Sequence, residues 1–332
     1  MQNSLINKAY SDGLKGWMCI AVLIHHLAIF SGIFDNTWFG HFLYLLGSWA
    51  VAVFLFLSGY GLYCSYAEKG IDYLKGFFRK RFLPLYASYA VAVVIYFVYD
   101  FKTGMTAVKV VKSLTWGGTI VSFGWFFQML FVMYLLFFFV FRFCKNKYLK
   151  SGIIGAVLLA YLIFAHCFGQ YDTPVIAFAT GMIAGVHRVS IRRFLRKYTG
   201  LVMPISFMAF FSVYMLYVLG TIMGRFHMGY VTWSALSALA DQGIIWFAVC
   251  ACLLCERFSF PLIVNPVSLL IKEYSFEIYV LQGMIIRALN GIIANRILYF
   301  FAAGAAVIIV SIPFHLLLKP LIKLIKNEKR LT

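Results

Sequence analysis

Two adjacent histidines, and a lysine eleven residues before the second, are the first residues whose types and spacing could do chemistry. Lys15, His25 and His26 stand in one apolar stretch. On an α-helix eleven residues turn about 20° past three full turns, so Lys15 and His26 share a face roughly 16 Å apart, while His25 points about 100° away. A neutral imidazole suits proton transfer near neutral pH, and an ammonium group can hold an anion. Alternatively, the histidines only form hydrogen bonds with a neighbouring helix.

A second cationic group precedes another apolar stretch. Arg79, Lys80 and Arg81 stand just before Pro84, where they suit the phosphates of an anionic cytosolic ligand such as coenzyme A. Position alone favours ordinary anchoring of the helix end against anionic lipid. Because this cationic group occurs together with His26, we favour a binding site for such a ligand over lipid anchoring.

Several ionisable or nucleophilic side chains also fall within apolar stretches, where charge is costly in a membrane. Asp241, beside Gln242, and Arg287 could bind an acceptor substrate together or form a structural ion pair. Glu277 is a third such group. Ser58 beside Gly59 could be a nucleophile, as in an intramembrane protease, but small residues also let helices pack closely in lipid, which we favour.

Membrane helices must position these side chains. Of the 332 residues, 63% are hydrophobic, 19% aromatic and 12% charged, a composition that a soluble fold cannot bury. The apolar runs are about 20 residues long, enough to cross roughly 30 Å of hydrocarbon. We predict an all-α polytopic membrane protein, a single bundle and a single domain over residues 1–332 with an approximate core of 10–320. About ten transmembrane helices are expected, near residues 16–34, 41–65, 82–100, 123–142, 151–168, 174–187, 200–222, 234–255, 275–294 and 297–318.

The basic residues predict the orientation of these spans. With ten spans, all but six of the 29 Lys and Arg residues fall on the side of the N-terminus; the exceptions are Lys102, Lys109, Lys112, Arg225, Arg287 and Arg296. Positive residues collect on the cytoplasmic side, so both termini are predicted to be cytoplasmic. The same asymmetry explains the net charge of +18 without a nucleic-acid partner.

Other features narrow the possible functions. The seven cysteines, Cys252 and Cys255 of a CxxC among them, lie in or beside apolar runs, so we expect buried thiols and no metal site. The N-terminal stretch does not resemble a signal peptide, and we expect no processing. No internal repeat supports an inverted-repeat transporter.

Five short motifs, in order along nearly the whole chain, resemble those of the integral-membrane acyltransferase-3 family. DGLKGWMCIAVLIHHL is similar to the family's Arg-Gly, ten intervening residues and His, with Lys15 in place of the arginine and His26 at the histidine. The other four are FLFLSGYGL with Ser58 and Gly59, FFRKRFLPLY with Arg79, Arg81 and Pro84, GWFFQMLFVMYLLF with Trp125 and Tyr134, and SFEIYVLQ with Ser275, Glu277 and Tyr279.

The chain departs from the family pattern at two positions. Lys15 keeps the positive charge of the arginine but loses its bidentate fork, so it can still hold a phosphate or carboxylate. Gln282 stands where many members have a second histidine, so no proton transfer is assigned there.

The family contains bacterial O-acetyltransferases of surface polysaccharides, peptidoglycan and lipid-linked sugars. The resemblance implies an enzyme of the bacterial plasma membrane that moves an acyl group, expected to be acetyl, from cytosolic acyl-CoA to a hydroxyl of an envelope glycan or lipid-linked sugar. His26 would be the general base, acting on the acceptor or on the way to a transient acyl carrier, and Lys15, Arg79 and Arg81 would bind the coenzyme A phosphates. Acyl-CoA would be a substrate, with no tightly bound cofactor.

Further acceptor-side or structural candidates are His25, Ser58, Trp125, Tyr134, Asp241, Glu277 and Arg287. Two other functions remain alternatives. One is a transporter or flippase of lipid-linked saccharide, and the other is an inactive partner subunit of another membrane enzyme.

Overall fold

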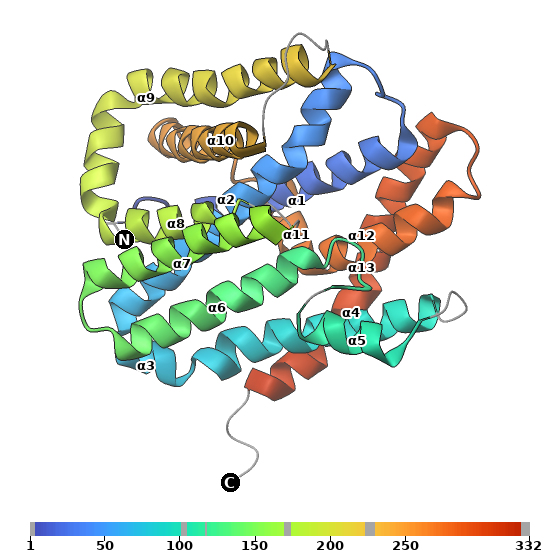
Figure 1. The fold of residues 1–332 in the computed structure, drawn as a ribbon, viewed down its shortest axis with the longest axis horizontal. Helices are drawn as coiled ribbons and strands as arrows, with labels where there is room; N and C mark the ends of the chain where they lie inside the picture. Colours follow the sequence, from blue (N-terminus) through green and yellow to red (C-terminus); the bar gives the residue numbers. More distant parts are fainter. Residues whose placement is uncertain (1–3, 101–104, 117, 169–173, 223–229, 327–332) are drawn as a thin grey trace. The chain divides into compact units, whose positions relative to one another are not determined.

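The computed structural model describes residues 4–100, 105–116, 118–168, 174–222 and 230–326. Regular structure within these ranges is helical throughout (Figure 1), which confirms the all-α prediction. The α-helices are α1 (Lys8–Ser31), α2 (Trp38–Lys69), α3 (Ile71–Lys75), α4 (Leu83–Tyr99), α5 (Ala107–Leu114), α6 (Trp125–Phe143), α7 (Lys147–Phe168), α8 (Ile176–Val186), α9 (Arg188–Tyr217), α10 (Tyr230–Phe258), α11 (Pro266–Glu273), α12 (Ser275–Asn290) and α13 (Arg296–Lys326), with π-helical turns η1 (Phe78–Phe82) and η3 (Val218–Ile222). Lys102, Arg225, Lys329 and Arg330 lie outside the described residues, as do the side chains of Lys147 and Cys167.

Several helices have the length and composition of membrane spans. Seven stretches of the described chain are long and apolar enough to cross a bilayer: Lys8–Ser31, Trp38–Lys69, Phe78–Tyr99, Trp125–Phe143, Arg188–Gly220, Thr232–Phe258 and Arg296–Lys326. A multi-pass membrane protein follows.

Each of the ten predicted spans coincides with a helix, but two of these helices are shorter than a full crossing. Helix α8 has 11 residues and α12 has 16. Eleven residues extend about 16 Å, roughly half the thickness of the hydrocarbon. Most residues of α8 are buried against protein, so its length does not have to match the bilayer.

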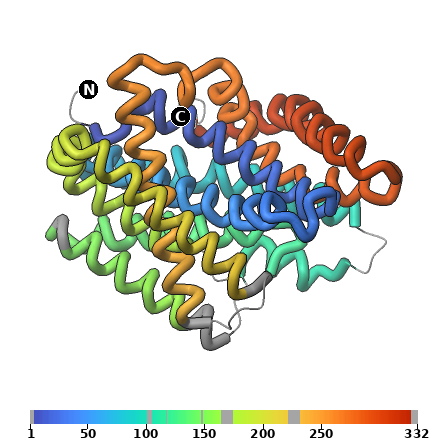
Figure 2. Tube along the Cα trace, turned by 90° about the horizontal axis from the view of Figure 1, so that it is seen from above, coloured from blue at the N-terminus to red at the C-terminus, as the bar shows by residue number. Residues whose placement is uncertain are grey.

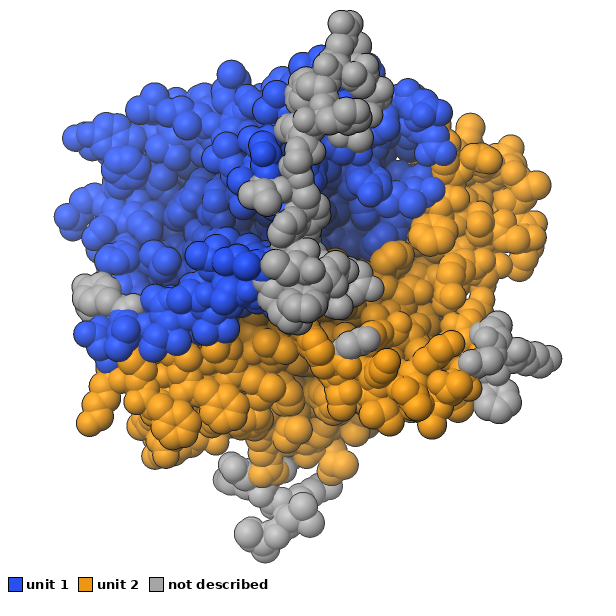
Figure 3. All heavy atoms as spheres, viewed as in Figure 1, with its two compact units in different colours: residues 1–29, 34–67, 146–273 blue, residues 30–33, 68–145, 274–332 orange. Residues whose placement is uncertain are grey.

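The chain forms two compact units (Figure 3). Unit 1 comprises residues 1–29, 34–67 and 146–273, and unit 2 comprises residues 30–33, 68–145 and 274–332. Each unit therefore combines segments that are distant in the sequence.

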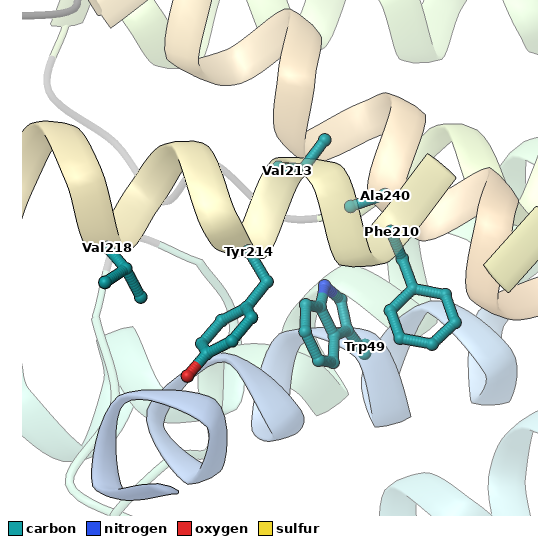
Figure 4. Packing of buried hydrophobic residues seen from close by; sticks show 6 residues of the cluster. All are labelled: Trp49, Phe210, Val213, Tyr214, Val218 and Ala240. Carbon is teal, nitrogen blue, oxygen red and sulfur yellow. The ribbon is translucent and has the colours of Figure 1, made fainter. Parts of the chain in front are cut away.

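In unit 1, aromatic side chains pack α2 against α9 and α10. The rings of Trp49 and Phe210 lie 5.4 Å apart, centroid to centroid, and both are buried in a cluster completed by Val213, Tyr214, Val218 and Ala240 (Figure 4). The hydroxyl of Tyr214 donates to the carbonyl of Trp38, 2.7 Å away. This hydrogen bond fixes the end of α9 against the start of α2. Helices α9 and α10 run alongside each other (Figure 2).

Small residues permit a close crossing of α2 and α8. A Cβ atom at Gly59 would collide with the carbonyl of Phe178, and one at Gly181 would collide with the carbonyl of Phe56. This contact supports the interpretation of the Ser58–Gly59 pair as a packing motif.

Helix α9 bends at Tyr198, whose φ and ψ of −114° and 21° are not helical. Pro204 lacks an N–H, and its ring crowds the carbonyl four residues earlier, at Gly200. The basic segment before the bend, predicted as a connection, is helical.

Unit 2 is held together by tyrosine hydroxyls that donate to backbone carbonyls. Tyr96 of α4 donates to Val280 of α12 over 2.9 Å, and Tyr299 of α13 donates to Ile286 over 3.0 Å. Both tyrosines are almost fully buried, and these bonds satisfy their polar ends within an apolar interior.

Candidate active site

Helix α1 of unit 1 carries His26, the predicted general base, and Lys15, a predicted coenzyme A ligand. It is continuous from Lys8 to Ser31, so the spacing of Lys15 and His26 on one face holds, with roughly 16 Å between them along the helix. The side chain of His26 is buried, with a residue exposure of 7%. The helix therefore places an imidazole in the protein interior and an ammonium group near its N-terminal end.

His25 is fixed in one orientation by α2. Its Nδ1 lies 2.9 Å from the carbonyl oxygen of Leu43, which can only accept, so Nδ1 carries a proton and, in the neutral ring, Nε2 is the acceptor. The ring contacts that of Tyr44 at 6.0 Å and that of His26 at 4.9 Å, centroid to centroid. A Cβ atom at Gly47 would lie 2.5 Å from Cδ2 of His25, so only glycine leaves room for this ring.

The N-terminal half of α1 packs closely on the segment that leads into α11. Cβ atoms at Gly13 and Gly16 would collide with the carbonyls of Ile263 and Ser268. The indole N–H of Trp17 donates to the carbonyl of Leu262 over 3.0 Å. These contacts fix the backbone on both sides of Lys15.

A mixed-charge cluster surrounds Lys15. Its Nζ lies 3.7 Å from Asp12, and Nζ of Lys272 in α11 lies 3.9 Å from the same carboxylate. Two ammonium groups around one carboxylate leave a net positive charge for an anion. Lys272 was not predicted as a site residue, because it lies 257 positions after Lys15 in a segment predicted as a connection.

The predicted cations of unit 2 lie on η1. Arg79 donates from Nε to the carbonyl of Ile325 over 2.9 Å, whereas Arg81 is exposed. Isolated π-helical turns are uncommon and occur frequently at functional sites. The hydrogen bond to Ile325 holds the side chain of Arg79, and the role of Arg79 in phosphate binding remains a prediction.

The acidic candidates have different surroundings. In unit 2, Oε1 of Glu277 lies 2.9 Å from Nδ1 of His315, and Arg287 pairs with Asp100 over 3.2 Å. Asp241 is buried in α10 of unit 1. His315, a single histidine in α13, was not predicted as a site residue, because its partner is 38 positions away.

The remaining candidates are partly buried. Ser58 lies on α2 in unit 1, and Trp125 and Tyr134 lie on α6 in unit 2. Gln282, which replaces the family histidine, is 1% exposed on α12. Within the described residues no group of three or more His, Cys, Asp or Glu side chains could hold a metal ion.

Comparison with known proteins identifies the family. A family model described as an acyltransferase domain matches residues 8–316, across both compact units. No curated protein and no solved structure gives a significant match. Because the family model covers nearly the whole chain, the protein belongs to the acyltransferase-3 family of membrane acyltransferases.

Proposed function

We propose that the protein transfers an acyl group, acetyl in the first instance, from cytosolic acyl-CoA to a hydroxyl of an envelope glycan or lipid-linked sugar. The observation that carries this proposal is the buried His26 on the same face of α1 as Lys15, in a chain of the acyltransferase family. The separation of roughly 16 Å suits an extended thioester arm whose phosphates are held at the lysine.

In the proposed reaction His26 removes the proton of the acceptor hydroxyl. The hydroxyl oxygen attacks the thioester carbonyl, the C–S bond breaks, and the coenzyme A thiolate takes the proton from the imidazolium. His25 is a positioning residue in this scheme, because its ring is held by Leu43 and contacts that of His26.

The cations near the N-terminal end of α1 would bind the coenzyme A phosphates. Lys15 and Lys272 share Asp12, so an incoming phosphate meets two ammonium groups whose mutual repulsion the carboxylate already reduces. Arg79 and Arg81 remain predicted phosphate ligands from the sequence motif.

The test measures acetyl-CoA binding and acetyl transfer by the full chain in lipid nanodiscs. Lys15→Ala and Arg79→Ala are expected to weaken acetyl-CoA binding at least tenfold, because each removes a charge-assisted contact. His26→Ala should bind acetyl-CoA as the wild type does, yet transfer no acetyl group.

Lys8→Ala is the matched control, since Lys8 is an exposed lysine on the same helix. The proposal fails if the wild type does not bind acetyl-CoA, or if His26→Ala retains full activity. Passage of a lipid-linked saccharide across liposomes without acyl-CoA would instead indicate a transporter.

A further inference from the structure

Unit 1 has an open cavity where the end of α1 meets the start of α2 and the end of α9. Its volume is about 300 Å³, within the size range of small-molecule sites. The side chains that give it chemical character are those of Ile29, Asp35, Asn36, His41, Tyr44 and Tyr217.

The cavity lies next to His25 and to His26, the proposed base. Ile29 follows His26 by three residues, or about 4.5 Å along the helix. Tyr44, in the wall, contacts the ring of His25, which in turn contacts the ring of His26. A molecule in the cavity is therefore about one helical turn from the proposed base.

The described lining of the cavity favours a neutral ligand. Among the described residues that line it none is Lys or Arg, and one is Asp35. The coenzyme A phosphates would therefore gain no cationic partner from these residues, whereas a neutral acceptor needs none.

The same lining fits a sugar. A pyranose has an apolar face of C–H groups, which tyrosine rings can cover, and a rim of hydroxyls that donate to carboxylate and amide oxygens. Tyr217 packs between His41 and Trp233, with ring centroids 6.3 and 5.2 Å away, so it presents a supported aromatic wall. Nε2 of His41 is buried without a hydrogen-bond partner among the described residues, and a sugar hydroxyl would satisfy it.

The turn that carries the polar groups is fixed before any ligand arrives. Asn36 has a φ of 59°, a conformation that asparagine tolerates better than most residues. The hydroxyl of Thr37 donates to the carbonyl of Phe34 over 2.6 Å and accepts from the amide of Gly40 over 2.9 Å. A preformed turn lowers the entropy lost on binding.

We propose that this cavity binds the acceptor as a neutral sugar ring, with one hydroxyl directed towards His26. The inference rests on the proposed acyl transfer and adds the place in unit 1 where the acceptor binds. Acceptor and donor would then approach the base from opposite ends of α1, since Lys15 lies at the other end.

The test uses methyl β-D-glucopyranoside and the methyl glycoside of N-acetylglucosamine as probes, observed by saturation-transfer difference NMR with the full chain in nanodiscs. At least one probe should bind the wild type. Tyr217→Ala and Asp35→Asn should weaken that binding at least tenfold, whereas Tyr217→Phe, which keeps the ring, should retain most of it. Ile29→Trp, which fills the cavity, should abolish sugar binding but leave acetyl-CoA binding unchanged.

Matched controls are Trp116→Ala and Asp72→Asn, an exposed aromatic and an exposed acid that do not line the cavity. The inference is wrong if neither glycoside binds the wild type, or if Ile29→Trp binds sugar normally. If the wild type binds a glycoside but does not bind acetyl-CoA, or transfers acetyl without needing His26, the proposed acyl transfer is contradicted instead.

Discussion

At the scale of single residues, the orientation of His25 depends on a missing side chain. Gly47→Ala would place a methyl group 2.5 Å from the His25 ring, far inside van der Waals contact, so the ring must move and lose its bond to Leu43. Because His25 contacts His26, we expect kcat for acetyl transfer to fall about tenfold or more, with the KM for acetyl-CoA nearly unchanged.

Gly61→Ala is the control for this substitution, because it lies on the same helix and a Cβ atom there meets nothing within 4 Å. It should retain wild-type kinetics. An unchanged kcat in Gly47→Ala would show that the orientation of His25 does not matter for transfer.

Residue types and their spacing predicted only some of the side-chain contacts that are present in the structure. The eleven-residue spacing in α1 is a local property of one helix, so the sequence predicted it. The contacts of His315 with Glu277 and of Arg192 with Glu256 join positions 38 and 64 apart, and helical periodicity carries no information on such pairs. Lys272 was missed for the same reason.

At the scale of helices, apolar runs predicted where the ten span helices lie, but they predicted neither the lengths of these helices nor the short helices α3, α5 and α11. Hydropathy registers a run of apolar residues, whereas helix length also depends on turns such as the one that follows Ser31. α11 lay within a predicted connection; its start depends on Asn265, whose side chain accepts from the amide of Ser268 over 2.9 Å. Such local caps are weaker sequence signals than apolar runs.

The pairing of α9 with α10 near their charged ends makes a testable contribution to stability. Arg192, 8% exposed, donates from one guanidinium nitrogen to both oxygens of Glu256 at 2.8 and 2.7 Å, and from another to the carbonyls of Ser4 and Leu5. Arg192→Ala removes these four hydrogen bonds and should cost about 2 kcal/mol. This is below the usual range for a buried pair, because Glu256 is partly exposed and keeps Arg196 within 3.8 Å.

The measurement is the midpoint of thermal unfolding in nanodiscs, which should fall by a few degrees. Arg193→Ala removes an exposed arginine from the next position and should leave the midpoint unchanged. Equal midpoints for the two variants would mean that the Arg192 contacts do not stabilise unit 1.

At the scale of the whole molecule, the number of crossings decides where the termini lie. Within the described residues seven helices meet the length and composition of a span, and an odd number of crossings would place the termini on opposite sides of the membrane. Ten crossings would place them on the same side, as the distribution of 29 Lys and Arg residues predicts. We propose the latter, because a short helix such as α8, enclosed by its own unit, can be accommodated by protein instead of lipid.

Single cysteines, introduced one at a time after the seven native cysteines are replaced, distinguish the two topologies. Each is tested on intact cells with a thiol reagent that does not cross the membrane. Lys8→Cys and Lys326→Cys lie near the two ends of the described chain and should both react only after the cells are opened. Thr37→Cys, in the turn between α1 and α2, should react on intact cells, which would also place the sugar cavity on the outer side. Reaction of only one terminal cysteine on intact cells would establish an odd number of crossings, and the proposed cytoplasmic position of both termini would then be wrong.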